Sequence, residues 1–196
     1  MSQRLRIYLT GVGGQGTLTA TTLLSRTVMD QGIEVVSGEI HGMAQRGGVV
    51  ESTVLLGGWH SPSIYHGEAD IILGFEPLET LRALPYLAVG GFVLSATEFV
   101  PPPSVNMGQA CLPDIEGIKD TVRKAAGKAW FLPIQTLGRE AGAVQSGNTA
   151  MLGALCAAGL LPFGPEALRE SVRKHLPPKV VEVNLRALDL GVGSIM

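Results

Sequence analysis

The spacing of hydrophobic residues along the chain switches between two periods. Residues 4–10 alternate and are rich in β-forming types, which predicts a strand. From Gly16 to Gln31 apolar residues recur at three- to five-residue steps, and Gly32 follows as a stop, which predicts a helix. Residues 33–36 restart a strand. Strand, glycine-rich turn, helix and strand make a βαβ unit, for which we expect a right-handed crossover.

The rest of the chain continues to alternate between the two patterns. We expect further strands at 49–56, 70–75, 91–95 and 129–132, and helices at 78–87, 114–126, 148–158, 165–175 and 180–190. The runs at 70–75 and 91–95 are continuous and apolar, as in central strands covered on both faces. The predicted fold is α/β: a three-layer α/β/α, Rossmann-like arrangement with a mostly parallel sheet. Residues 1–196 are expected to form one domain.

The composition is apolar, with 45% hydrophobic and 16% charged residues. The surplus of apolar residues indicates either contact with a membrane or a surface that another protein covers. Because no apolar run approaches the roughly 20 residues of a spanning helix, and the N-terminus lacks the pattern of a signal peptide, we expect a cytoplasmic protein with a partner and no membrane contact. The net charge of −2, without a block of Lys or Arg, predicts no binding to nucleic acid.

The chain has two cysteines, Cys111 and Cys156, far apart and without a C-x-x-C spacing. We therefore expect the chain by itself to hold neither an iron–sulfur cluster nor a structural zinc. Both cysteines are predicted to be small buried hydrophobic residues. The sequence singles out no metal-binding residue and no catalytic residue.

The turn between the first strand and the first helix reads Gly11-Val12-Gly13-Gly14-Gln15-Gly16. Glycines permit positive φ angles and let a ligand approach the backbone, and amides at a helix N-terminus bind phosphate or carboxylate. Alternatively, the glycines only form a tight turn. The run also fits the dinucleotide pattern G-x-G-x-x-G, which requires an acidic residue at the end of the second strand. Glu34 and Glu39 match that requirement loosely.

A second loop follows the second strand and reads His41-Gly42-Met43-Ala44-Gln45-Arg46-Gly47-Gly48. If strands 1 and 2 are neighbours, their carboxyl ends bring both loops to one edge of the sheet, where α/β proteins bind ligands. Arg46 offers a planar fork for an anion or a partner. His41 is either an acid or base, or a hydrogen-bonded loop histidine. Asn148 is expected to cap the helix at 148–158, with a ligand contact as the alternative.

These two loops, together with residues 146–153 and 179–184, resemble the gamma-type domain family of pyruvate and other 2-oxoacid:acceptor oxidoreductases. The similarity covers nearly the whole chain. The His-Gly-Met-Ala-Gln-Arg form of the second loop is similar to the small subunits of the indolepyruvate ferredoxin oxidoreductase branch.

The resemblance implies a small subunit that is inactive alone and belongs to an enzyme that oxidatively decarboxylates indolepyruvate to the acyl-CoA. Thiamine diphosphate, magnesium and iron–sulfur clusters would lie on a large alpha subunit, with coenzyme A as co-substrate and ferredoxin as acceptor. The isolated chain could form a homodimer. The residues expected to shape the approach of coenzyme A are Gly11, Gly13, Gly14, Gln15, Gly16, His41, Gln45, Arg46, Gly47, Gly48 and Asn148.

Three other interpretations stay open. The chain could be the gamma subunit of a pyruvate or 2-oxoglutarate ferredoxin oxidoreductase. It could also be a purely structural subunit without a ligand, since obligate interfaces are apolar. The third alternative is a small NAD-binding Rossmann oxidoreductase.

Overall fold

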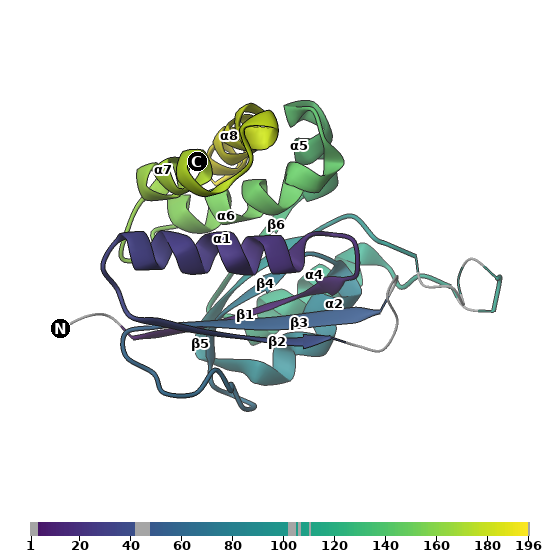
Figure 1. The fold of residues 1–196 in the computed structure, drawn as a ribbon. Coiled ribbons are helices and arrows are strands. Elements are labelled where there is room, and N and C mark those ends of the chain that lie inside the picture. Colours follow the sequence, from purple (N-terminus) through teal and green to yellow (C-terminus); the bar gives the residue numbers. More distant parts are fainter. Residues whose placement is uncertain (1–3, 42–47, 102–104, 106, 110, 196) are drawn as a thin grey trace.

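Six strands form one sheet in the computed structural model, which describes residues 4–41, 48–101, 105, 107–109 and 111–195. The strands are β1 (Leu5–Val12), β2 (Val35–His41), β3 (Val49–Leu56), β4 (Ala69–Gly74), β5 (Leu87–Ala96) and β6 (Lys128–Leu132). They are ordered β2-β3-β1-β4-β5-β6. Among the described strands β3 runs opposite to the other five, so its pairs with β1 and β2 are antiparallel and the other three pairs are parallel. The predicted mostly parallel sheet is confirmed (Figure 1).

The position of β3 corrects the expectation that the first two strands are neighbours. β3 lies between β1 and β2 and pairs with both, Leu56 lying opposite Leu5 on one side and Val35 on the other. A crossover to a parallel strand needs about a dozen or more residues. The connection from His41 to Val49 is shorter than that, so β3 returns along β2 as the second strand of a hairpin.

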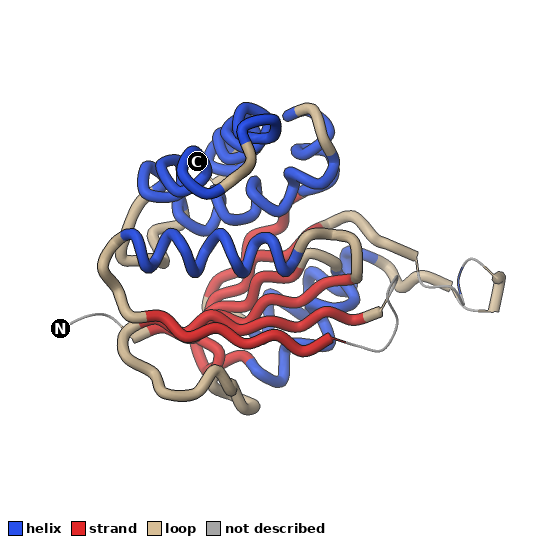
Figure 2. The backbone as a smooth tube through the Cα atoms, viewed as in Figure 1, coloured by secondary structure: helices blue, strands red, loops and turns tan. Residues whose placement is uncertain are grey.

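Helices cover both faces of the sheet, which confirms the three-layer arrangement (Figures 1 and 2). One face carries α1 (Thr17–Asp30), α5 (Ile134–Ala141), α6 (Gly147–Ala157), α7 (Pro165–His175) and α8 (Pro178–Gly193). The other carries α2 (Pro77–Ala83) and α4 (Ile115–Ala125). Two short 3-10 turns, η1 (Leu84–Tyr86) and η2 (Val144–Ser146), complete the list of described elements.

The helix expected at 78–87 is shorter in the structure. It ends at Ala83, because Pro85 lacks the amide hydrogen that a further turn would use, and β5 begins at Leu87. α5 is not among the helix ranges expected from the sequence. The other predicted helices and strands differ from the observed ones mainly at their ends.

α6 and α8 pack unusually closely because each has a glycine at the crossing. A Cβ atom on Gly153 of α6 would lie 2.5 Å from the carbonyl oxygen of Leu188, and one on Gly191 of α8 would lie 1.9 Å from that of Ala150. Every residue of α6 from Gly147 to Cys156 is buried. This close contact joins α6 to the C-terminal half of α8.

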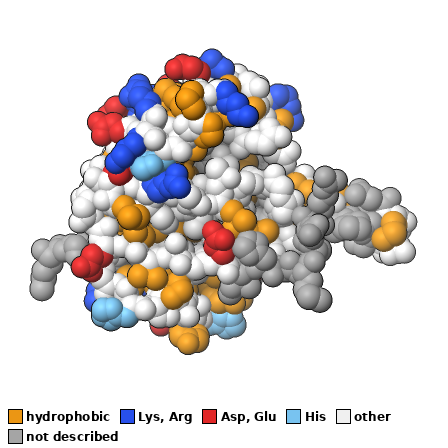
Figure 3. All heavy atoms as spheres, viewed as in Figure 1, with side chains coloured by type: hydrophobic (Ala, Val, Ile, Leu, Met, Phe, Trp, Pro, Cys, Tyr) orange, Lys and Arg blue, Asp and Glu red, His pale blue; other side chains and the backbone are white. Residues whose placement is uncertain are grey.

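Most of the apolar surplus is inside the molecule, in two clusters on opposite faces of the sheet. Among the described residues the large exposed hydrophobic side chains are Met29, Tyr65, Val89, Met107 and Val144. Figure 3 shows hydrophobic side chains as separate patches on the face in view, with Lys and Arg gathered at the end formed by the C-terminal helices. In the part of the chain that the structure describes, no helix is both long and apolar enough to cross a membrane.

Candidate functional site

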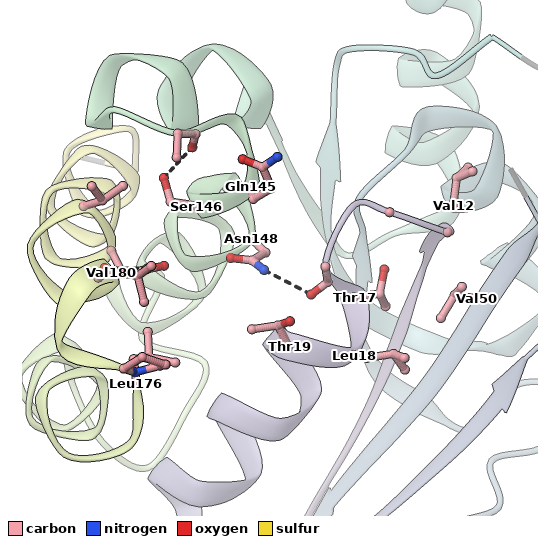
Figure 4. A pocket seen from close by; sticks show the side chains of 17 residues that line it. Val12, Thr17, Leu18, Thr19, Val50, Gln145, Ser146, Asn148, Leu176 and Val180 are labelled. Carbon is pink, nitrogen blue, oxygen red and sulfur yellow. Dashed lines mark hydrogen bonds between the residues drawn. The ribbon is translucent and has the colours of Figure 1, made fainter. Parts of the chain in front are cut away.

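A pocket of about 860 Å³ opens between the N-terminal ends of α1, α6 and α8 (Figure 4). The residues lining it are Val12, Gly13, Gly14, Gly16, Thr17, Leu18, Thr19, Val50, Ala143, Gln145, Ser146, Asn148, Leu176, Pro177, Val180, Val183 and Asn184. None of these described residues is charged. The volume lies in the range of small-molecule sites, which is about 300–1,000 Å³.

The glycine-rich turn forms one wall, and two of its glycines have left-handed backbone conformations. Gly14 has φ 102° and Gly16 has φ 80°. A Cβ atom at Gly14 would meet nothing within 4 Å, whereas one at Gly16 would lie 2.3 Å from Nδ2 of Asn148. Position 16 therefore needs glycine for its backbone angle and for the space that Asn148 occupies. Gly11 is still part of β1, and a Cβ there would lie 2.8 Å from Oγ1 of Thr17.

Gln15 fixes the turn from inside. Its Oε1 accepts a hydrogen bond of 2.8 Å from the backbone amide of Val12, and its Nε2 donates one of 2.9 Å to the carbonyl oxygen of Phe75. Both polar ends of the side chain are used, and Gln15 does not line the pocket. The structure thus gives this predicted site residue the role of joining the end of β1 to the residue after β4.

The two glycine-rich loops meet at their ends. The amide of Gly13 donates a 2.9 Å hydrogen bond to the carbonyl oxygen of Gly48. His41 is the last residue of β2. Its side chain and the residues Gln45, Arg46 and Gly47 lie outside the described residues, so the roles assigned to them stay predictions.

The first turn of α1 supplies the free hydrogen-bond donors of this wall. The first amides of a helix, here those of Thr17, Leu18 and Thr19, have no intrahelical acceptor. Gly16 precedes them and caps the helix without a side chain, and the first turn contains no acidic residue. Aligned amides carry a partial positive charge at this end of a helix. This wall therefore suits a phosphate or carboxylate group.

Asn148 does not cap its helix, so that expectation was wrong. Ser146 precedes α6, while Asn148 lies within it, is 6% exposed, and donates from Nδ2 to the carbonyl oxygen of Gly16 at 3.1 Å. The ligand contact stays a prediction for Asn148, which lines the pocket. Sequence reasoning missed this role because the partner is 132 residues away in the chain.

The opposite wall is apolar and was not predicted. It consists of Leu176 and Pro177 before α8, and of Val180 and Val183 within it. Asn184 adds a polar group to the same wall, and its Oδ1 accepts a 2.6 Å hydrogen bond from the Thr149 hydroxyl. The spacing of Val180, Val183 and Asn184 on one helical face was the available signal, but it gives no partner for that face.

The geometry does not match the dinucleotide interpretation. That site requires the second strand to lie beside the first, with an acidic residue at its tip. Here β3 separates β2 from β1. Glu34 lies just before the start of β2, where its carboxylate approaches Gly58, and Glu39 lies on the edge strand.

The two cysteines differ from each other. Cys156 is buried, as predicted, and burial raises the pKa of its thiol to about 12, which keeps it protonated at neutral pH. Cys111 is exposed, so the prediction of a buried residue was wrong; it lies in a coil segment before α4 and outside both hydrophobic clusters of the described residues. Among the described residues no group of three or more His, Cys, Asp or Glu could hold a metal ion.

Two buried carboxyl groups lie on the other face of the sheet. Glu76 precedes α2 and accepts a 3.0 Å hydrogen bond from the amide of Glu79 at that helix's N-terminus. One carboxylate oxygen of Glu79 pairs with Arg82 at 2.6 Å, and the other is buried without a hydrogen-bond partner. Burial raises the pKa of both carboxyl groups. They face away from the pocket and affect stability.

Residues 6–194 match the family model described as pyruvate ferredoxin/flavodoxin oxidoreductase. The chain belongs to this oxidoreductase family. Within it, the chain is 42% identical to the indolepyruvate oxidoreductase subunit IorB of Pyrococcus horikoshii, over 95% of this chain and 93% of that subunit. It is 38% identical to the IorB subunit of Methanothermobacter thermautotrophicus, over 96% of both chains. The predicted resemblance to the small subunits of the indolepyruvate branch is confirmed.

Solved structures from the family share the fold. Pyruvate oxidoreductase subunit PORC from Thermotoga maritima superposes with a TM-score of 0.72 at 21% identity, covering 98% of this chain and 97% of that one. The 2-oxoglutarate:ferredoxin oxidoreductase from Magnetococcus marinus, solved with 2-oxoglutarate, coenzyme A and succinyl-CoA bound, superposes with a TM-score of 0.70 at 19% identity. That match covers all of this chain but 31% of the other, so the family fold also occurs as part of a longer chain.

Proposed function

We propose that this chain is the small subunit of an indolepyruvate ferredoxin oxidoreductase, which converts the aryl pyruvate and coenzyme A to the acyl-CoA and carbon dioxide and passes two electrons to ferredoxin. Four IorB subunits with 38–42% identity over nearly the whole chain support the indolepyruvate branch. A large partner subunit would carry the reaction centre. There, thiamine diphosphate with magnesium would supply the decarboxylation, and iron–sulfur clusters would supply the path for the electrons.

The pocket is the observation that supports a role for this chain itself in ligand binding. One wall offers the free amides of Thr17–Thr19, and the other is formed by Leu176, Pro177, Val180 and Val183. Such a pocket fits a ligand with anionic groups at one end and a longer, less polar arm. Coenzyme A has this character, with phosphates followed by the pantetheine arm. We propose that the phosphates bind at the N-terminus of α1 and that the arm follows the apolar wall.

Purification of the chain from its native cell tests the proposed assembly. We expect a large subunit with thiamine diphosphate and iron–sulfur clusters to co-purify and the complex to reduce ferredoxin with indolepyruvate and coenzyme A. Recovery of the chain alone, without such a subunit, contradicts the proposal. Faster turnover with pyruvate or 2-oxoglutarate would instead favour the other branches of the family.

A charge placed in the first turn of α1 tests the pocket. Thr19 is exposed and lines the pocket, so Thr19→Glu brings a carboxylate to the proposed phosphate site. A carboxylate at a helix N-terminus stabilises the helix, so folding is preserved. We expect the KM for coenzyme A in the purified complex to rise about ten-fold or more. The matched control is Thr22→Glu, at an exposed position one turn further along α1 that does not line this pocket. An equal KM in both variants contradicts the proposal.

A further inference from the structure

A line of hydrogen bonds runs from the glycine-rich turn to α8. Nδ2 of Asn148 donates to the carbonyl oxygen of Gly16 at 3.1 Å, and Nδ2 of Asn184 donates to that of Val180 at 2.8 Å. Because each amide nitrogen faces a carbonyl group, the orientation of both side-chain amides is fixed. Their Oδ1 atoms both lie within reach of the Thr149 hydroxyl, at 3.1 Å for Asn148 and 2.6 Å for Asn184.

The Thr149 hydroxyl cannot serve both acceptors fully, since it has one hydrogen. The contact to Asn184 is the shorter by half an ångström, which places the hydrogen there. Oδ1 of Asn148 is then left without a good donor, although Asn148 is only 6% exposed. Leaving a buried acceptor unsatisfied is costly.

The open acceptor belongs to the pocket. Asn148 and Asn184 both line it, whereas Thr149 is 1% exposed and lies behind them. Figure 4 shows the amide nitrogen of Asn148 directed at the start of α1 and its oxygen on the opposite side, toward α8. A donor carried by a molecule in the pocket would complete the hydrogen bonding of Asn148.

We propose that Asn184 is a positioning residue: by accepting the Thr149 hydrogen, it keeps Oδ1 of Asn148 available to an N–H or O–H group of the bound ligand. This inference rests on the function proposed above, in which the ligand is coenzyme A. The pantetheine arm of coenzyme A carries secondary amide N–H groups and a hydroxyl, which are donors of the required kind. In this proposal Oδ1 of Asn148 accepts a hydrogen bond from the pantetheine arm. Its Nδ2 donates to the carbonyl oxygen of Gly16, in the turn beside the phosphates.

Two substitutions, alone and together, test this assignment in the purified complex with its large subunit. Asn184→Ala removes the acceptor at 2.6 Å, so the Thr149 hydrogen turns to Asn148 and occupies one of the two lone pairs of its Oδ1, which weakens this atom as an acceptor for the ligand. We expect the KM for coenzyme A to rise about ten-fold at unchanged kcat. Thr149→Val removes the hydrogen while keeping the shape of the side chain, so the KM should stay within about two-fold of the unmodified complex.

The double variant Asn184→Ala/Thr149→Val gives the decisive comparison. It has the same enlarged pocket as Asn184→Ala but no hydrogen to block Asn148, so the KM should return to within about two-fold of the unmodified value. A structural role predicts the opposite, with the double variant at least as impaired as Asn184→Ala and the KM following the loss in melting temperature. That result, or an unchanged KM in Asn184→Ala, overturns the proposal.

The comparison with Thr19→Glu separates this inference from the proposed function. If Thr19→Glu raises the KM for coenzyme A and Asn184→Ala does not, only the role of Asn184 is wrong. If neither variant changes the KM, the pocket does not bind coenzyme A, and both proposals are wrong.

Discussion

The backbone amide of Gly13 donates a hydrogen bond of 2.9 Å to the carbonyl oxygen of Gly48, so the end of the second loop is attached to the glycine-rich turn. This contact has a consequence for ligand binding, because an amide that is already bonded is not available to a phosphate. The amides of the first turn of α1 are among the donors that remain.

Gly16→Ala should be much more destabilising than Gly14→Ala. Both residues have positive φ angles, which cost an alanine about 1–2 kcal/mol. Only at position 16 would the Cβ also collide with Asn148, so we expect a further loss of about 1–3 kcal/mol there. Urea denaturation of the two variants measures the difference. Equal losses would show that Asn148 moves aside without cost.

Gln15→Leu should weaken the fold rather than ligand binding alone. The substitution removes hydrogen bonds to Val12 and Phe75 and leaves two backbone groups without partners, for an expected loss of about 2 kcal/mol. The measurement is the free energy of unfolding of the isolated chain. A variant with unchanged stability and weaker binding of coenzyme A would instead make Gln15 a ligand contact.

Gly191→Ala tests the close packing of α6 and α8. The new Cβ would overlap the carbonyl group of Ala150, so the helices must separate, and we expect a loss of about 3 kcal/mol or more. Gly193→Ala is the matched control in the same helix, because a Cβ there meets nothing within 4 Å. The control should change stability by less than about 0.5 kcal/mol. Thermal unfolding of both variants decides whether the crossing requires glycine.

Glu79→Gln should flatten part of the pH dependence of stability. Burial raises the pKa of Glu79 above its ordinary value of 4.5, with Arg82 acting in the opposite direction. The folded chain therefore keeps this proton to a higher pH than the unfolded chain does, so the stability contribution of Glu79 falls as pH rises from 4.5 through the raised pKa. Relative to the unmodified chain, the variant should gain stability between pH 4 and pH 7.

The control for this prediction is Glu116→Gln, at an exposed position in the first turn of α4. Glu116 forms an ion pair with Lys119 at the surface, where such pairs contribute little. Denaturation curves from pH 4 to pH 8 should show no matching trend in the control. A loss of stability in Glu79→Gln that grows toward neutral pH would contradict the assignment.

The layers of the fold could be predicted from the sequence, because helices and strands differ in the spacing of their apolar residues and this spacing is a local property of the chain. The predicted neighbour of the first strand was wrong, although the information was present: seven residues lie between His41 and Val49, too few for a crossover to a parallel strand. The two loops still meet, since β2 and β1 run in the same direction on either side of β3.

The site was predictable only where its residues are close in sequence. The glycine-rich turn can be recognised from its composition. Its position at the start of α1 follows from the helical spacing of the apolar residues that come after it. The bond from Asn148 to Gly16 and the wall from Leu176 to Val183 depend on how α6 and α8 pack, which no local pattern specifies. Cys111 is a further example. Its residue type predicted burial, but it lies in an exposed coil segment, which the local sequence does not specify.

The double attachment of Gln15 has a consequence for affinity. A turn whose backbone is already anchored to Val12 and Phe75 has little conformational entropy left to lose when a ligand arrives. More of the interaction free energy then appears as binding. Preorganisation of this kind would strengthen the proposed binding of an anion to a wall made of neutral backbone amides, which has no arginine or lysine among the described residues that line the pocket.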